Sequence, residues 1–238
     1  MLKEFVEKIV ELATPQTYTV NGDTYSIDRL HRIAPHVDRP ETFHVSGLDS
    51  IEKLVRNEIH KLPVRQVMVR VCGPTRVEVS TTFRDDLSRD TLYIAESDVP
   101  GFRDGFRDRE TALIQLRSLF APTPDLDYLL TLLSRVSKEA NVTSTDNGVT
   151  QQVEARAGIA LLDTIQIKPR VSLQPFRTFL EVAQPESEFL LRLDENGRVG
   201  LWEADGGVWK LEAKRLIASW LGDALADLVE VGSVVIMI

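Results

Sequence analysis

Cysteine is nearly absent from this chain of 238 residues, which contains only Cys72. A single cysteine forms no internal disulfide and cannot supply a cluster of thiolate metal ligands. Cys72 lies in the alternating run 67–73, where a small buried side chain is expected, and the surrounding sequence offers no base to activate a nucleophile. We therefore predict that Cys72 is a core residue.

Long apolar runs are absent as well. No stretch reaches the length of about 18 consecutive apolar residues that a membrane-spanning helix needs. Charged residues interrupt the apolar pattern of the first 13 residues, which therefore lack the uninterrupted apolar segment of a secretory signal. We expect a cytoplasmic protein that has no contact with a membrane.

The sequence also lacks the common motifs of catalysis and cofactor binding. It contains no zinc-binding His-Glu-x-x-His, no phosphate-binding loop, no dinucleotide fingerprint and no Gly-x-Ser-x-Gly elbow. We therefore predict no cofactor and no catalytic residue, and an enzyme is the less favoured class.

Positive charge is in deficit, since the net charge is −8. Residues 181–230 hold eleven acids and five bases, and no long block of successive lysines or arginines occurs. Because proteins bind duplex DNA largely by neutralising phosphates, generic DNA binding is not expected. An accessory role on nucleic acid would need a focused arginine surface.

What the chain has in excess is arginine, with twenty residues against eight lysines. Between residues 65 and 109, eight arginines alternate with eight acids, so ion pairing on a solvated surface is the simplest interpretation. A guanidinium also makes bidentate contacts to phosphate, so some of these side chains could instead converge on a small anionic ligand. The candidates are Arg103 and Arg107, in a repeated Gly-Phe-Arg-Asp unit, and Arg109 just after it.

Four histidines lie within thirty residues and offer a weaker alternative. A metal site for hydrolysis of a phosphodiester could use His31, His36, Asp38 and His44. Their spacing matches no familiar set of ligands, and the simpler interpretation is that the four are loop and helix-terminus histidines.

The pattern of apolar residues predicts an α+β fold, with mostly antiparallel sheets, several amphipathic helices and a β-rich second half. Asn-Gly pairs at 21–22 and 147–148 each predict a tight hairpin, at 16–27 and 141–155. Ser46 or Asp49 is expected to cap the helix 51–62. Further helices are expected at 2–13, 108–120, 126–136 and 209–228, and further strands at 42–45, 67–71, 77–79, 91–95, 159–162, 164–167, 176–182, 187–193, 198–203 and 233–238.

We expect three regions, 1–62, 63–138 and 139–238, packed as one compact domain or two. The apolar run 233–238 has no charge, so it must pair with other strands to avoid aggregation. Pairing within the subunit is favoured over pairing with a neighbour.

Three linked stretches of the second half carry a family resemblance. They are residues 142–158, around Asp146-Asn147-Gly148; residues 173–189, around Pro175-Phe176-Arg177; and residues 201–209, in which two tryptophans flank Gly206-Gly207. In order and spacing they resemble the YfdQ-like proteins of phages and prophages. The resemblance implies a phage or prophage early protein, acting in the cytoplasm of a bacterial host, and it supplies no catalytic residues because the function of that family is unknown.

The residues in these stretches allow two interpretations. Arg177 could be a buried ion pair within an aromatic core, or it could form a ligand or subunit surface together with Asp146 and Asn147. We predict a non-catalytic protein that acts by binding and assembles as a homo-oligomer, through the polar hairpin 141–155 and the terminal strand. Its other partner could be a host or phage protein or a small anionic ligand; the alternatives are a metal-dependent hydrolase or nuclease, or a nucleic-acid accessory protein.

Overall fold

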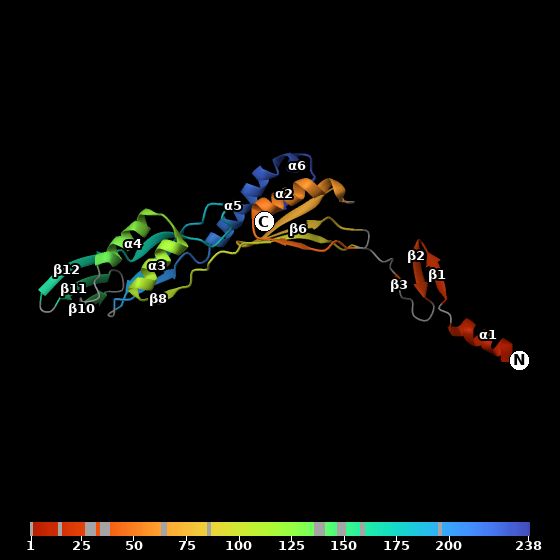
Figure 1. Cartoon of the computed structure of the whole chain (residues 1–238), viewed down its shortest axis with the longest axis horizontal. Coiled ribbons are helices and arrows are strands. Elements are labelled where there is room, and N and C mark those ends of the chain that lie inside the picture. The colour runs from red at the N-terminus through yellow and green to blue at the C-terminus, as the bar shows by residue number, and fades with distance from the viewer. Residues whose placement is uncertain are drawn as a thin grey trace. The chain divides into compact units, whose positions relative to one another are not determined.

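The computed structural model describes residues 2–13, 16–26, 32–33, 39–62, 66–84, 87–135, 141–146, 151–157, 160–194 and 197–238. The chain divides into two compact units, Met1–Pro40 and Glu41–Ile238 (Figure 1). Both units combine helix with mostly antiparallel strands, and the second half of the chain is rich in strands. The predicted α+β class is confirmed.

The N-terminal unit contains one helix and a small three-stranded sheet, β1-β2-β3. Asn21 and Gly22, with φ of 54° and 88°, make the tight turn between β1 and β2, as the Asn-Gly pair predicts. The elements are α1 (Leu2–Ala13), β1 (Thr17–Val20), β2 (Asp23–Ser26) and β3 (Arg32–Ile33).

The C-terminal unit contains a five-stranded sheet in the order β16-β5-β6-β7-β4, covered on one face by two helices, α2 and α5 (Figure 1). β5, β6 and β7 form an antiparallel meander, whereas β4 and β16 join its two sides in parallel. The elements are β4 (Phe43–Val45), α2 (Leu48–Glu58), η1 (Ile59–Lys61), β5 (Val67–Gly73), β6 (Arg76–Thr81), β7 (Thr91–Glu96), α5 (Trp209–Ala224), α6 (Ala226–Glu230) and β16 (Val234–Met237).

Alternation along β5 and β6 builds the first core. Val67, Val69 and Val71 point toward the helices and are buried, while the residues between them point to the other face. Cys72 follows Val71 in this alternation and is exposed, so the prediction that it is a core residue is wrong. A small side chain and a strand-like run do not by themselves decide which face of a sheet a residue occupies.

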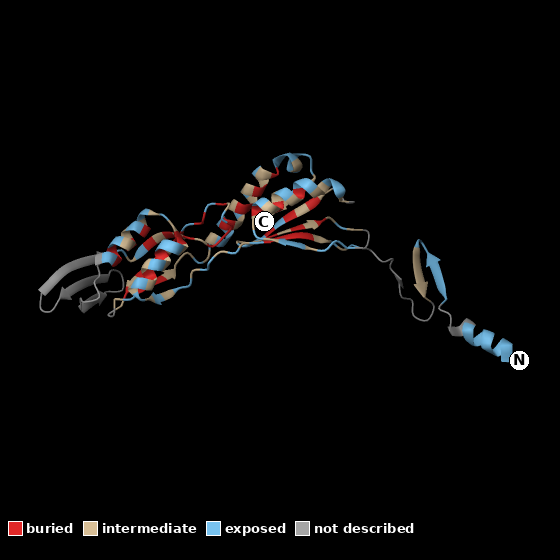
Figure 2. Ribbon diagram, viewed as in Figure 1, coloured by how far each residue is buried: buried red, intermediate tan, exposed pale blue. Residues whose placement is uncertain are grey.

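The second five-stranded sheet has the order β8-β15-β14-β13-β9 and packs against two helices, α3 and α4 (Figures 1 and 2). Its core includes the ring of Phe189, which packs edge to face with Phe102 and Phe120, at centroid distances of 5.6 and 6.3 Å. The elements are β8 (Gly105–Arg107), α3 (Arg109–Leu119), β9 (Phe120–Ala121), α4 (Pro124–Arg135), β13 (Arg170–Pro175), β14 (Ser187–Leu193) and β15 (Val199–Glu203).

A separate three-stranded sheet, β10-β11-β12, carries the second predicted hairpin. The antiparallel pairing of Asn141 with Arg156 through Asp146 with Gln151 fits that prediction, and the turn 147–150 lies outside the described residues. Its strands are β10 (Asn141–Asp146), β11 (Gln151–Ala157) and β12 (Ala160–Ile167), so the two short strands expected at 159–167 are one.

The strand expected at 176–182 is wrong. Residues 176–186 form an irregular connection between β13 and β14, and the buried carboxamide of Gln184 replaces a partner strand. Its oxygen accepts from the backbone N–H groups of Arg177 at 2.9 Å and Thr178 at 3.2 Å. Its nitrogen donates to the carbonyl oxygens of Phe179 at 3.1 Å and Val182 at 3.4 Å.

The same connection joins the two cores. Phe179 is fully buried in the first core, and the hydroxyl of Thr178 donates to the carbonyl of Pro74, at the β5–β6 turn, over 2.5 Å. The carboxylate of Glu181 accepts from the backbone N–H of Leu48 at 2.7 Å, at the first turn of α2. This carboxylate satisfies an N–H that the helix itself leaves unpaired.

The predicted cap of this helix is therefore wrong. The N-cap residue is Gly47, and neither Ser46 nor Asp49 makes a side-chain capping bond. The cap comes from Glu181, far along the chain, and local sequence patterns register only caps within a few residues of the helix start. A Cβ atom at Gly47 would lie 2.6 Å from the Glu181 carboxylate, so a larger residue would displace that side chain from its capping position.

We expect Gly47→Ala and Glu181→Ala each to lower the free energy of unfolding by about 1 kcal/mol, because each removes the same capping bond. The double variant should lose little more than either single variant, and urea denaturation measures all three. Ser46→Ala is the control and should be nearly neutral. Additive losses would show that the two residues act separately.

Candidate functional site

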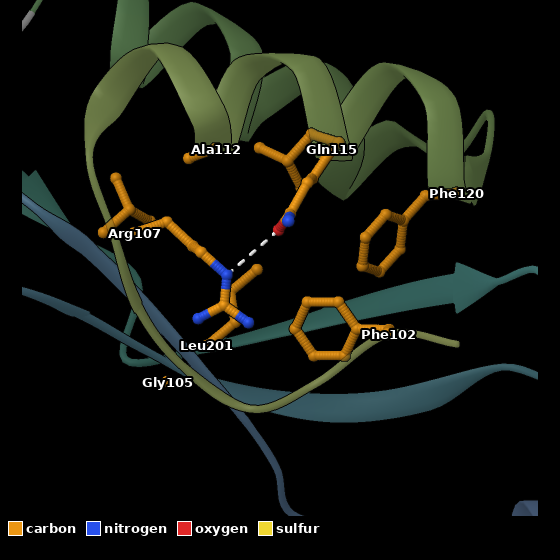
Figure 3. Close-up of a pocket in the computed structure, with 9 residues that line it drawn as sticks. Phe102, Gly105, Arg107, Ala112, Gln115, Phe120 and Leu201 are labelled. Carbon is orange, nitrogen blue, oxygen red and sulfur yellow. Dashed lines mark hydrogen bonds between the residues drawn. The ribbon is translucent and has the colours of Figure 1, made fainter. Parts of the chain in front are cut away.

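The repeated Gly-Phe-Arg-Asp unit folds over a small cavity between α3 and the second sheet (Figure 3). Arg107 lies at this cavity, where its Nε donates to the side-chain oxygen of Gln115 at 3.2 Å. Its two terminal nitrogens donate to the carbonyl oxygens of Phe106 at 3.2 Å and Arg103 at 2.6 Å. The guanidinium is thus held by the chain's own acceptors.

The interior of the cavity is small and apolar. Its volume is about 10 Å³, barely enough for a single water molecule. The other lining side chains include Phe102, Leu116, Phe120 and Leu201. Gly105, with φ of 129°, places the chain close to the Arg107 guanidinium, and a Cβ there would lie 3.2 Å from it. This cavity has no room for a small anionic ligand.

The neighbouring candidates do not converge with Arg107 on one point. Arg103 is exposed. Arg109 donates from Nε to the carbonyl oxygen of Leu133 at 2.6 Å, near the C-terminal end of α4, where a cation also complements the helix dipole. The three arginines therefore do not form one anion-binding cluster.

Arg177 is the most buried ionic group of the described chain, with its side chain enclosed by polar partners. Its guanidinium forms an ion pair with Glu203 and hydrogen bonds with the Ser187 hydroxyl and, at 3.1 Å, with the Pro185 carbonyl. It also stacks on the ring of Trp209, with the central carbon 4.0 Å from the ring centroid. This geometry agrees with the first of the two interpretations of Arg177, a buried ion pair beside an aromatic ring.

Burial lowers the pKa of the Arg177 guanidinium, while the carboxylates of Glu203 and Asp205 oppose that effect. The side chain keeps its charge at neutral pH, because arginine is not deprotonated in proteins. Its Nε and the indole Nε1 of Trp209 are buried without a hydrogen-bond partner among the described residues. The cation–π contact between the guanidinium and the indole ring is a further attraction at this position, separate from hydrogen bonding.

Replacement of Arg177 by alanine should lower the free energy of unfolding by about 3 kcal/mol, because it removes a buried guanidinium and leaves the partly buried carboxylate of Glu203 unpaired. Arg170→Ala is the matched control: it breaks a largely exposed pair with Glu188 and should cost about 1 kcal/mol or less. Chemical denaturation of both variants checks the difference, and equal losses would contradict this account of Arg177.

The face of the first sheet that the helices leave open carries a ladder of charges. Glu78 on β6 pairs with Arg70 on β5 and with Arg76, whose Nη2 lies 2.8 Å from the carboxylate. Arg76 also pairs with Glu96 on β7. The hydrogen bond from Arg70 is the largest influence on Glu78 and holds the pKa of its carboxyl group below the ordinary value. These arginines pair within the chain.

Because the pKa of Glu78 is lowered in the folded state, its contribution to stability is present above the unfolded-state pKa of about 4.3 and is lost as the pH falls below it. We expect Glu78→Gln to be less stable than the parent chain at pH 7, with the difference shrinking below about pH 4. Urea denaturation between pH 7 and 3 measures this difference; a constant difference would exclude the titration of Glu78 as its cause.

The remaining sequence candidates do not form a site in the described chain. His44 is exposed on β4, whereas His31, His36, Asp38 and Asn147 lie outside the described residues. Asp146 ends β10, and only its backbone pairing, with Gln151, is described. No group of three His, Cys, Asp or Glu side chains gathers at one point among the described residues.

Comparisons with known proteins give no relative, since no family model, no curated protein and no solved structure matches this chain. The structure describes no helix that is long and apolar enough to cross a membrane. A functional assignment therefore depends on the surfaces of the molecule itself.

Proposed function

We propose that this chain is a non-catalytic phage or prophage protein that acts by binding and assembles with copies of itself. The observation that carries the proposal is the apolar face of α1. Within its unit, the described apolar side chains of this helix are exposed, including Leu2 at 81%, Phe5 at 64% and Ile9 at 48% (Figure 2).

These side chains form one continuous stripe. Leu2, Phe5, Val6, Ile9 and Val10 follow the spacing that places residues on one side of a helix. Removing apolar surface from water is favourable by about 25 cal/mol per Å², so a stripe of this size favours docking to another protein surface.

The rest of the N-terminal unit also favours docking. Tyr18 and Val20 on β1 are exposed, and the unit offers only a twelve-residue helix and a small sheet. An isolated helix of this length is marginal in water, and a small sheet needs an apolar face to pack on. Contact with a partner would stabilise both.

The charges beside the stripe favour a protein partner over a membrane surface. Residues 2–13 contain two lysines and three glutamates. Helices that lie on anionic membranes are rich in lysine and arginine on their polar face, which this helix is not. Mixed charge instead suits a second copy of the same helix, because each sign can face its opposite. The polar hairpin formed by β10 and β11 is a second predicted assembly element, separate from α1.

The wild-type chain should form oligomers at micromolar concentrations, as measured by size-exclusion chromatography with light scattering. The double substitution Phe5→Glu/Ile9→Glu should shift the distribution to smaller species, because it places charge on the apolar stripe. A wild-type chain that stays monomeric over the whole range of concentrations would overturn the proposal.

The matched control is Lys3→Gln/Lys8→Gln, which lowers the net charge by the same amount on the polar side of the helix. It should leave the oligomer intact. If both variants dissociate equally, overall charge and not the apolar stripe governs assembly.

A further inference from the structure

The edge of the first sheet at β16 is a second surface that another strand could reach. β16 is the last strand of that sheet, and its described pairing is the parallel one with β5, from Val234–Val67 to Met237–Arg70. The prediction that the apolar terminus pairs within the subunit is confirmed. β5 pairs with one side of β16, and the other side of β16 is the outer edge of the sheet.

The backbone N–H and C=O groups of successive residues of β16 point alternately toward β5 and toward the outer edge of the sheet. The carbonyl of Ser233 accepts from the N–H of Val67 at 2.9 Å, so Ser233 directs its backbone groups toward β5. Because this direction alternates along a strand, Val235 also directs its backbone groups toward β5. Val234 and Ile236 direct their N–H and C=O groups to the outer edge. These outward groups can accept another strand.

The other edges of the two five-stranded sheets carry features that discourage pairing. β4 has three residues and follows Pro40 and Glu41; β8 also has three, with Gly105 and Arg107 among them; and β9 has two and precedes Pro122. Short strands, charge and proline are the devices by which proteins protect sheet edges. β16 contains four residues, all apolar, with no charge, proline or glycine.

We propose that β16 pairs antiparallel with β16 of a second copy about a two-fold axis at Val235. In this register, Val234 of one copy exchanges hydrogen bonds with Ile236 of the other, which uses the outward backbone groups of both. Val235 lies directly opposite its own copy. The two sheets become one continuous sheet, and no charged residue faces another across the new pair.

A second copy fits this edge better than β4 of a neighbour does. Pairing of β16 with β4 would be head to tail and would continue into a ring or a filament, whereas the two-fold pair is complete with two chains. Val235 also supports the contact, because its side chain is 37% exposed on the open face of the sheet, opposite Met68 of β5. The inference rests on the proposed self-association but uses a surface separate from α1.

Cysteine cross-linking tests the register. In a Cys72→Ser background, Val235→Cys should form an intermolecular disulfide under mild oxidation, so that most of the protein migrates at twice the chain mass without reductant. The two Cα atoms of such a non-hydrogen-bonded pair lie about 4.5 Å apart, within the range of disulfides. Val231→Cys in the same background is the control, since Val231 is apolar and 71% exposed but lies outside β16.

A disulfide dimer of the Val235→Cys chain alone supports the register. Equal cross-linking of both variants, or none in a chain that sizing shows to be oligomeric, overturns the register and leaves the proposed function standing. A monomeric parent chain overturns both. Cross-linking of Val235→Cys to His44→Cys, in a series of higher oligomers, would show head-to-tail pairing and also overturn the two-fold pair.

A second measurement does not depend on disulfide formation. Val235→Lys places two positive charges opposite each other at the axis and should weaken the dimer, whereas Val231→Lys should not. Both variants should unfold at the same temperature as the parent chain when all three are measured as monomers. Dimers of equal stability in the two variants would overturn the role of Val235.

Discussion

The buried carboxamide of Gln184 satisfies four backbone groups of the connection between β13 and β14. Buried N–H and C=O groups need partners, and an irregular segment has no neighbouring strand to provide them. With its backbone satisfied, the connection can bury Phe179 in the first core, cap α2 through Glu181 and hold Arg177 beside the second sheet. Both cores of the C-terminal unit depend on this one side chain.

Local patterns predicted the elements that depend on local physics. The Asn21-Gly22 turn and the alternating strands β5 and β6 follow from short-range chemistry. The expected strand at 176–182, the cap of α2 and the burial of Cys72 were wrong because each depends on distant residues or on the choice of sheet face. Gln184 gives no sequence signal that separates it from a surface glutamine.

The same limit applies to the candidate residues for function, because the partner of each side chain depends on distant parts of the chain. The composition indicated an excess of arginine but not which groups these arginines contact. The structure shows those contacts residue by residue. Arg107 and Arg109 bind backbone carbonyls, Arg177 pairs with Glu203, and Arg70 and Arg76 pair with Glu78. A planar guanidinium with several donors can satisfy such acceptors together, and lysine cannot. The exposed stripe of α1 was foreseen as an amphipathic helix, but its exposure is a property of the folded unit.

The division of the chain near Pro40 has a consequence for stoichiometry. The stripe of α1 belongs to one compact unit and the edge of β16 to the other, so the two proposed contacts are borne by separate bodies of one polypeptide. A molecule with two self-pairing ends is bivalent. Occupancy of one end gives a dimer, and occupancy of both gives a chain that grows until its ends meet in a ring, so the protein concentration would set the length of the assembly.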